Sequence, residues 1–208
     1  MFIIDEAVMM LQDVDDERKE IAALALWRYA HANDAMIVAI REAGAIPLLV
    51  ELLKSGSAEA RRYAAGALEN IADANAENKV VIREAGGIPP LLALVEGGSA
   101  YAGPISAYAG PISVSALRTL AHNNEDNAVA TAVARGRVEA IVELARRGSV
   151  TIRTKLWGNP FEVVVQNAGA GAKRKAALVV AKLFRDCVEF PAPYDIKVAI
   201  ASFLQDPR

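Results

Sequence analysis

The chain has 208 residues, of which 53% are hydrophobic and 23% charged, a balance that suits one folded domain or a short repeat array and excludes global disorder. Its 25 acidic and 23 basic residues give a net charge of −2, which excludes a general attraction to nucleic acid or to anionic membranes. Cys187 is the one cysteine, so an intramolecular disulfide is excluded as well.

The expected location of the protein follows from three features of the sequence. A single thiol fits a reducing compartment. No apolar run approaches the roughly 18–20 residues needed to span a bilayer, and the acidic start MFIIDEAVMM has no basic segment of the kind that opens a signal peptide. We therefore expect a cytoplasmic or nuclear protein with no direct membrane insertion.

A repeat runs through the chain. The segment IREAGAIP at residues 40–47 returns as IREAGGIP at residues 82–89, which is 42 residues later. A period in the forties with helical patterning is typical of stacked helical repeats, here with three helices in each. Because each repeat in such an array contacts only its neighbours, the chain is expected to offer a long surface to another chain, and the period does not imply catalysis.

The first repeat, about residues 1–32, is expected to begin part of the way through. Residues 4–14 are predicted to form its second helix, because Ile4 lies 42 residues before Ile46 in the next repeat. Asp15 and Asp16 can cap the third helix, about residues 17–31, since negative charge stabilises the exposed N–H groups at a helix start.

The second repeat, about residues 33–74, is complete. Asn33 or Asp34 is expected to open its first helix, and Gly44 to end it. Pro47 is expected to start the second helix, and Ser57 to cap the third. The buried face of that third helix is predicted, from helical spacing, to comprise Ala60, Ala64, Ala67, Leu68 and Ile71.

The third repeat, about residues 75–124, contains a first insertion at about residues 99–112. The segment SAYAGPI occurs at residues 99–105 and again at 106–112, and removing one copy restores the 42-residue period. We interpret this as a tandem duplication, with a selected projecting loop as the alternative. The Gly-Pro pairs argue against a continuous helix there.

The fourth repeat, about residues 125–189, contains a second insertion at about residues 149–171. The sequences TIRTKLW and FEVVVQ flank a Gly-Asn-Pro turn, which is compatible with a small hairpin. A mobile surface loop is the favoured interpretation, because an isolated hairpin is marginally stable in water. A partial fifth repeat is predicted over residues 190–208, so we expect the array to be truncated at both ends.

The innermost position of the third helix recurs in every repeat. Its occupants are separated by one period plus any inserted residues, and we expect them to line up in one buried row. They are Leu26, Leu68, Leu117 and Val180.

Residues 33–98 resemble the armadillo repeat, and the third-helix sequence AAGALEN is most similar to vacuolar armadillo and plant U-box type arrays. The likeness is weaker but in register over residues 1–32 and 113–189. It implies an all-α fold, a right-handed α-solenoid of about four armadillo repeats, as a single array over residues 1–208. It also implies a concave groove, lined by the third helices, that binds an extended peptide or partner protein, often through a ladder of asparagines.

That ladder is incomplete when it is carried over to this chain position by position. Asn70 matches the ladder asparagine, whereas the equivalent positions in the other repeats hold Arg28, Thr119 and Lys182. Importin-alpha-type arrays place tryptophan one turn earlier, and this chain does not. Trp27 falls in the slot after Leu26 and is predicted to point elsewhere on its helix.

The candidate partner-binding groove combines the ladder positions, the positions one turn earlier and one further arginine. A single asparagine provides one amide clamp on a peptide backbone, and the basic residues add point charges, so an acidic or phosphorylated segment is the expected partner. The alternative for each residue is an ordinary solvated helix surface. The residues are Arg28, Arg62, Gly66, Asn70, Ser115, Thr119 and Lys182.

The sequence gives no support for catalysis. His31 and His122 occupy the same slot in two repeats that are too far apart to share a metal, and Cys187 has no histidine near it in sequence. We predict no enzyme activity, no catalytic residues, no metal site and no cofactor. The predicted function is a protein–protein interaction scaffold; the alternative is a substrate-recruiting armadillo fragment of a larger enzyme such as a U-box ubiquitin ligase.

Overall fold

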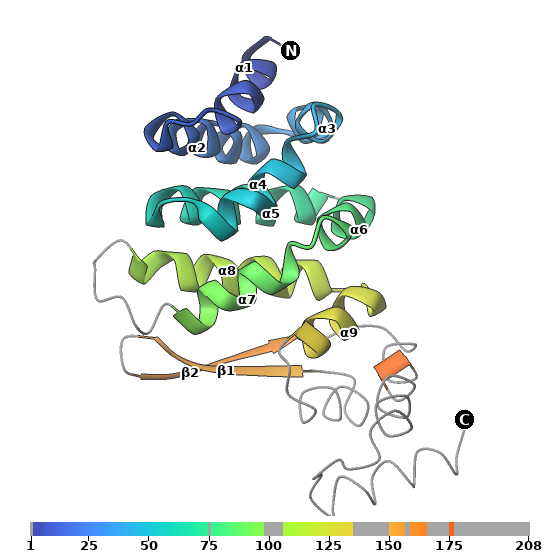
Figure 1. Cartoon of the computed structure of the whole chain (residues 1–208). Helices are drawn as coiled ribbons and strands as arrows, with labels where there is room; N and C mark the ends of the chain where they lie inside the picture. Colours follow the sequence, from blue (N-terminus) through green and yellow to red (C-terminus); the bar gives the residue numbers. More distant parts are fainter. Residues whose placement is uncertain are drawn as a thin grey trace, which may run out of the picture. The chain divides into compact units, whose positions relative to one another are not determined.

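The computed structural model describes residues 2–74, 76–97, 106–134, 150–156, 159–165 and 175–176. Over these residues the chain forms the helices α1–α9 and the strands β1 and β2 (Figure 1). Its contacts divide it into two units. Unit 1 comprises Met1–Leu120 with Arg153–Phe161, and unit 2 comprises Ala121–Ile152 with Glu162–Arg208.

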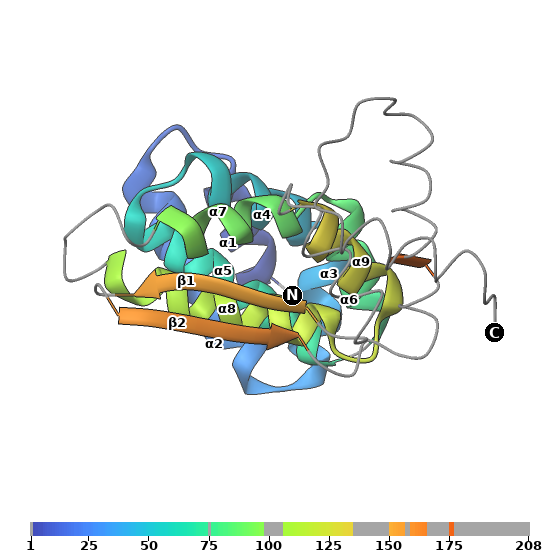
Figure 2. The ribbon, with the colours of Figure 1, turned by 90° about the horizontal axis from the view of Figure 1, so that it is seen from below.

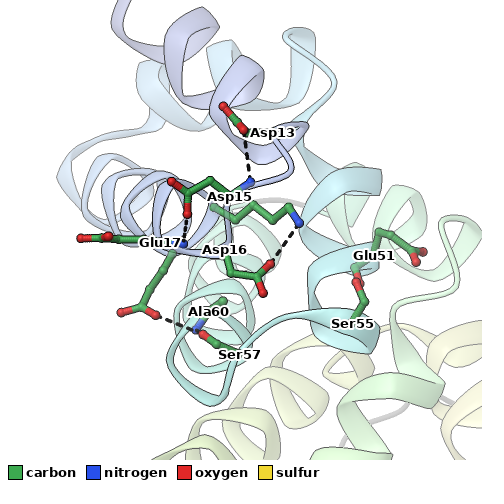
Figure 3. A network of polar contacts seen from close by, with 10 residues as sticks. Asp13, Asp15, Asp16, Glu17, Glu51, Ser55, Ser57 and Ala60 are labelled. Atoms are coloured by element: carbon green, nitrogen blue, oxygen red, sulfur yellow. Dashed lines mark hydrogen bonds and ion pairs between the residues drawn. The ribbon is translucent and has the colours of Figure 1, made fainter.

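Unit 1 opens with α1 (Phe2–Leu11) and α2 (Asp16–Ala32), joined by an acidic turn (Figure 3). Asp15 is the N-cap of α2, and its carboxylate accepts a hydrogen bond of 2.9 Å from the Glu17 N–H, which confirms the predicted cap. Asp13 accepts from the Asp15 N–H at 3.1 Å. This hydrogen bond and the nearby Arg18 hold the pKa of the Asp13 carboxyl below its ordinary value.

The next three helices are α3 (Asp34–Glu42), α4 (Ala45–Ser55) and α5 (Ala58–Ala74). Asn33 caps α3 by accepting from the Met36 N–H at 3.0 Å, and Ser57 caps α5 by accepting from the Ala60 N–H at 3.1 Å. Gly44, between α3 and α4, has φ +74°, a left-handed conformation that glycine adopts without strain. The predicted roles of Asn33, Gly44 and Ser57 are therefore confirmed.

Unit 1 continues with α6 (Ala76–Glu84), α7 (Ile88–Gly97) and α8 (Ser106–Ala121). The third helices of successive repeats, α2, α5 and α8, lie one beneath the other and run in the same direction (Figure 1). Leu26, Leu68 and Leu117 are each 0% exposed, which confirms the predicted buried row as far as the description extends. Val180 lies outside the described residues.

The start of α8 differs from the expectation. Residues 106–112, the second copy of SAYAGPI, are helical, so the prediction that this Gly-Pro pair interrupts the helix is wrong. Pro111 lies inside α8, where it removes one helical hydrogen bond and its ring crowds the preceding turn, at a cost of about 3 kcal/mol. Burial of Ala109, Val114 and Leu117 on the same helix offsets that cost. The first copy, residues 99–105, lies outside the described residues.

The second insertion also differs. Strands β1 (Val150–Leu156) and β2 (Asn159–Val165) are neighbours in a two-stranded sheet, and the two-residue connection makes them an antiparallel hairpin (Figure 2). The favoured interpretation as a loop is therefore wrong for these residues. It assumed a hairpin isolated in water, whereas Arg153–Phe161 groups with residues 1–120. The described chain is thus a helical solenoid to which one hairpin is added.

The described part of unit 2 is small. It contains α9 (Glu125–Ala134), whose first turn is capped by Asn124 accepting from the Asn127 N–H at 3.0 Å. The Lys175 ammonium lies 2.6 Å from Asp126 and 3.5 Å from Glu125, and these carboxylates raise its pKa. The remaining helices predicted for the fourth and fifth repeats lie outside the described residues. Within the described ranges, no helix combines the length and the apolar character needed to cross a membrane.

Candidate functional site: the face of the third helices

Two hydrogen bonds fix how α2 and α5 lie side by side. Near their N-terminal ends, the Ser57 hydroxyl donates to the Glu20 carboxylate at 3.0 Å. Near their C-terminal ends, the Asn70 amide donates to the Trp27 carbonyl at 3.4 Å. Since each bond joins a residue of α2 to one about 40 positions later, the two helices are parallel and in the register that the repeat predicts.

The same register continues from α5 to α8. The Ser115 hydroxyl of α8 donates to the Glu69 carboxylate of α5. One repeat earlier, the equivalent contact is between Trp27 of α2 and Gly66 of α5. These two pairs are 46 and 39 residues apart, and the difference of 7 is the length of one SAYAGPI copy. The three helices thus stack with a single repeated offset.

The predicted binding residues lie on a common stripe of this stack, which we call the third-helix face. Arg62, Gly66 and Asn70 are four residues apart, so they follow one another along one side of α5. On that face Arg28 is exposed, Gly66 is buried, and the others are half-buried: Arg62, Asn70, Ser115 and Thr119. Lys182 lies outside the described residues. Binding by these residues stays a prediction.

Trp27 also belongs to this face, so the prediction that it points elsewhere is wrong. A Cβ atom added to Gly66 would lie 2.7 Å from Cε2 and Nε1 of Trp27, so the indole ring rests directly on the glycine backbone. The centroid of the Trp27 ring is 5.8 Å from that of Tyr63, with the ring planes at 33°. Sequence reasoning missed Trp27 because its position depends on the absence of a side chain at residue 66, one helix away.

Arg62 stacks on the second of these aromatic rings. Its guanidinium carbon lies 4.6 Å from the centre of the Tyr63 ring, within the range of a cation–π interaction. Its Nε atom is buried and has no hydrogen-bond partner among the residues that the structure describes. Arg62 therefore keeps its full positive charge beside a flat, partly exposed aromatic surface.

Asn70 is only partly engaged within the chain. The 3.4 Å bond from its amide nitrogen to the Trp27 carbonyl is long for an N–H···O bond and correspondingly weak. Its side-chain oxygen makes no hydrogen bond to the described part of the chain. An asparagine in this state can still accept a bond from, and with a small rotation donate a bond to, the backbone of another chain.

Cations on the third-helix face differ from those elsewhere in their ion pairing. Arg28, Arg62 and Arg118 make no ion pair within the described ranges. Arg118 is exposed and was missed from the sequence, although it lies directly before Thr119 on α8. Cations away from the face do pair with carboxylates: Arg18 with Asp13, Lys19 with Asp16, Arg41 with Glu77, Lys54 with Glu51, Arg83 with Glu84 and Lys175 with Asp126.

The carboxylates of the face are engaged by other groups. Glu20 and Glu69 accept hydrogen bonds from the hydroxyls of Ser57 and Ser115. Asp73 lies close enough to Lys79 to oppose the lowering that partial burial causes in the pKa of that lysine. The arginines are therefore the charges that this face leaves without a counter-charge from the described chain.

The described residues give no indication of a metal site. No group of three histidine, cysteine, aspartate or glutamate side chains in the described ranges is placed to hold an ion. His31 in the last turn of α2 and His122 just after α8 are both exposed. The absence of enzyme activity stays a prediction.

Comparison with known proteins identifies the repeat. The family model of the Armadillo/beta-catenin-like repeat matches residues 33–73, which hold α3, α4 and α5. No curated protein matches the sequence. Among solved structures, an engineered protein is 25% identical with a TM-score of 0.57, and the alignment covers 96% of this chain and 67% of that one.

Two designed proteins make the fold explicit. One designed armadillo repeat protein is 22% identical with a TM-score of 0.58, and the alignment covers 96% of this chain and 79% of that one. Another, solved in complex with the peptide (KR)4, is 22% identical with a TM-score of 0.57, covering 97% of this chain and 80% of that one. The likeness to vacuolar and plant U-box arrays stays a prediction. Residues 33–73 are an armadillo repeat, and the fold of the chain is that of an armadillo-repeat solenoid.

Proposed function

We propose that the protein is a non-enzymatic interaction scaffold that binds an extended, acidic or phosphorylated segment of a partner protein across the third-helix face. Arg28, Arg62 and Arg118 attract the negative groups, and Asn70 bonds to the partner backbone. Lys182 extends the set in the fourth repeat, as the sequence predicts. The cytoplasm or the nucleus is the location that we propose, on the sequence features given above.

One observation carries the proposal. Each cation named in an ion pair lies away from this face, whereas the three arginines on it have no carboxylate partner in the described chain. An exposed ion pair stabilises by only about 0.2–1 kcal/mol, so a partner needs several such contacts, and a row of arginines supplies them. Guanidinium groups also bind carboxylate and phosphate oxygens in a bidentate manner.

The sign of the charge separates this face from a designed relative. The designed armadillo protein solved with (KR)4 holds a basic peptide. The face described here presents arginines that lack counter-charges, so we propose a partner of the opposite sign. The substrate-recruiting role within a larger enzyme also stays a proposal, and we place it second because no contact described above favours it.

The test uses a labelled octaglutamate peptide and a labelled (KR)4 peptide, with binding measured by fluorescence anisotropy at low salt. We expect octaglutamate to bind more tightly than (KR)4. The double variant Arg28→Glu/Arg62→Glu is expected to weaken octaglutamate binding at least about tenfold, because it removes two attractions of about 1 kcal/mol each and adds two repulsions. Raising the salt concentration weakens binding to the wild type as well.

Arg18→Glu is the matched control, because Arg18 is also an arginine of α2 but pairs with Asp13 away from the face. It is expected to leave octaglutamate binding unchanged. The proposal is wrong if the control and the double variant weaken binding equally, or if (KR)4 binds more tightly than octaglutamate.

A further inference from the structure

Three parallel rows of side chains cross the third-helix face, each with one member from α2, α5 and α8. The members of a row are 42 and 49 residues apart, which is one period without and with a SAYAGPI copy. The apolar row is Ile21, Tyr63 and Ile112. The floor row is Leu24, Gly66 and Ser115. The polar row is Arg28, Asn70 and Thr119.

The apolar row is accessible to a ligand. The side chain of Ile21 is 51% exposed, which is unusual for a large aliphatic residue inside a packed helix stack. Tyr63 and Ile112 are half-buried, and the Trp27 ring lies beside Tyr63. Scattered surface hydrophobics need no explanation, but this one continues into neighbouring apolar side chains on the next helices.

The spacing of the rows fits an extended chain. The apolar and polar rows are seven residues apart on each helix, which is about 10 Å at 1.5 Å per residue. In an extended segment, successive side chains point to opposite sides of the backbone. A segment that crosses the three helices along the floor row therefore directs alternate side chains toward the apolar row and toward the polar row.

The floor row allows the backbone of such a segment to approach. Gly66 has no side chain, and the Ser115 hydroxyl is turned to Glu69. Helix axes packed about 8–10 Å apart place the outer two of three helices about 20 Å apart, which an extended chain covers in about six residues.

The charges decide what the polar side of the segment carries. Arg28 and Arg118 are exposed on the polar half of the face and have no ion pair in the described chain. The carboxylates on the same half, Glu69 and Asp73, are accompanied by the Ser115 hydroxyl and by Lys79. Negative side chains opposite the polar row are therefore favoured over positive ones.

We infer that the partner segment alternates apolar and acidic residues over about six positions, with its apolar side chains on Ile21, Tyr63 and Ile112. This inference rests on the proposed function and adds the sequence pattern that the face selects. A segment of the same composition in two blocks cannot satisfy both rows, because half of its apolar side chains face the polar row.

The experiment compares three fluorescein-labelled octapeptides by anisotropy: alternating valine and glutamate, four valines followed by four glutamates, and octaglutamate. We expect the alternating peptide to bind at least about fivefold more tightly than the block peptide, which corresponds to about 1 kcal/mol. Ile21→Ser is expected to weaken the alternating peptide more than the block peptide. Arg28→Glu is expected to weaken all three.

The outcomes separate the two proposals. If octaglutamate binding depends on Arg28 while the alternating and block peptides bind equally, the inference is wrong and the proposed function stands. If no peptide responds to Arg28→Glu, both are wrong. A circular dichroism spectrum of each variant, with helix content equal to the wild type, excludes misfolding as the cause of a lost signal.

Discussion

Helices α5 and α8 hold the same place in successive repeats but are built differently. Both bury the leucine of the inner row completely, Leu68 in one and Leu117 in the other. At its start, however, α5 is capped by Ser57, whereas α8 begins within a duplicated heptapeptide and contains Pro111. The inner face of the third helix is thus kept while its N-terminal end varies.

The comparison shows which contacts decide the fold of a repeat. Burying a leucine side chain contributes about 1.5–3 kcal/mol, and several apolar residues of α8 are buried together. Their sum exceeds the cost of one proline in the helix. Packing against the neighbouring repeat therefore maintains a helix that local sequence preferences alone would interrupt.

The largest expected effect tests whether the two inner faces are equivalent. Leu68→Ala and Leu117→Ala each remove a fully buried side chain and leave a cavity, so each is expected to lower the free energy of unfolding by about 2–5 kcal/mol. Urea denaturation followed by circular dichroism measures both. A loss below about 1 kcal/mol for Leu117→Ala alone would show that α8 is packed more loosely than α5, contrary to this comparison.

The next effect concerns the difference between the helices. Pro111→Ala restores a backbone N–H inside α8 and removes the ring, so it is expected to raise the free energy of unfolding by about 1–3 kcal/mol. Thermal and urea denaturation measure the change. A decrease in stability would mean that the proline ring is itself required for packing, which this account of α8 does not predict.

The smallest effect concerns the cap that α5 has. Ser57→Ala removes the acceptor for the Ala60 N–H and the bond to Glu20, and it is expected to destabilise the protein by about 1 kcal/mol. Ser57→Asp serves as the control, because aspartate also caps a helix, although it lies close to Glu20. If Ser57→Asp is destabilised more than Ser57→Ala, repulsion with Glu20 outweighs the cap.

Local chemistry predicted much of the fold. The caps at Asp15, Asn33 and Ser57 and the glycine turn at Gly44 depend on a few adjacent residues, and all four are observed. The buried row at Leu26, Leu68 and Leu117 followed from the period alone, because the same offset is repeated between helices.

The errors arose where distant residues decide the structure. The helical start of α8 depends on burial against its neighbours, and the β1–β2 hairpin includes residues that group with the first 120. Neither effect is visible in a short window of sequence. The repeat register therefore fixed the positions of inner residues better than it fixed the ends of helices or the form of the insertions.

The candidate site was predicted in position but not in state. The register placed Arg28, Arg62 and Asn70 on one face, and the structure has them there. It did not show that Trp27 rests on Gly66, nor which arginines have a carboxylate beside them, since these depend on contacts between helices. Ion pairing across the whole surface can only be compared once coordinates exist.

The contact between the Trp27 indole and Gly66 makes this residue a built-in optical reporter. An indole that is half open to solvent emits at wavelengths that shift when a ligand displaces water from its ring, and Trp27 lies where a bound segment would cover it. In a protein whose other tryptophan, Trp157, is replaced by phenylalanine, the emission spectrum would respond to occupancy of this surface without any attached dye. Candidate partners could then be titrated in their native form.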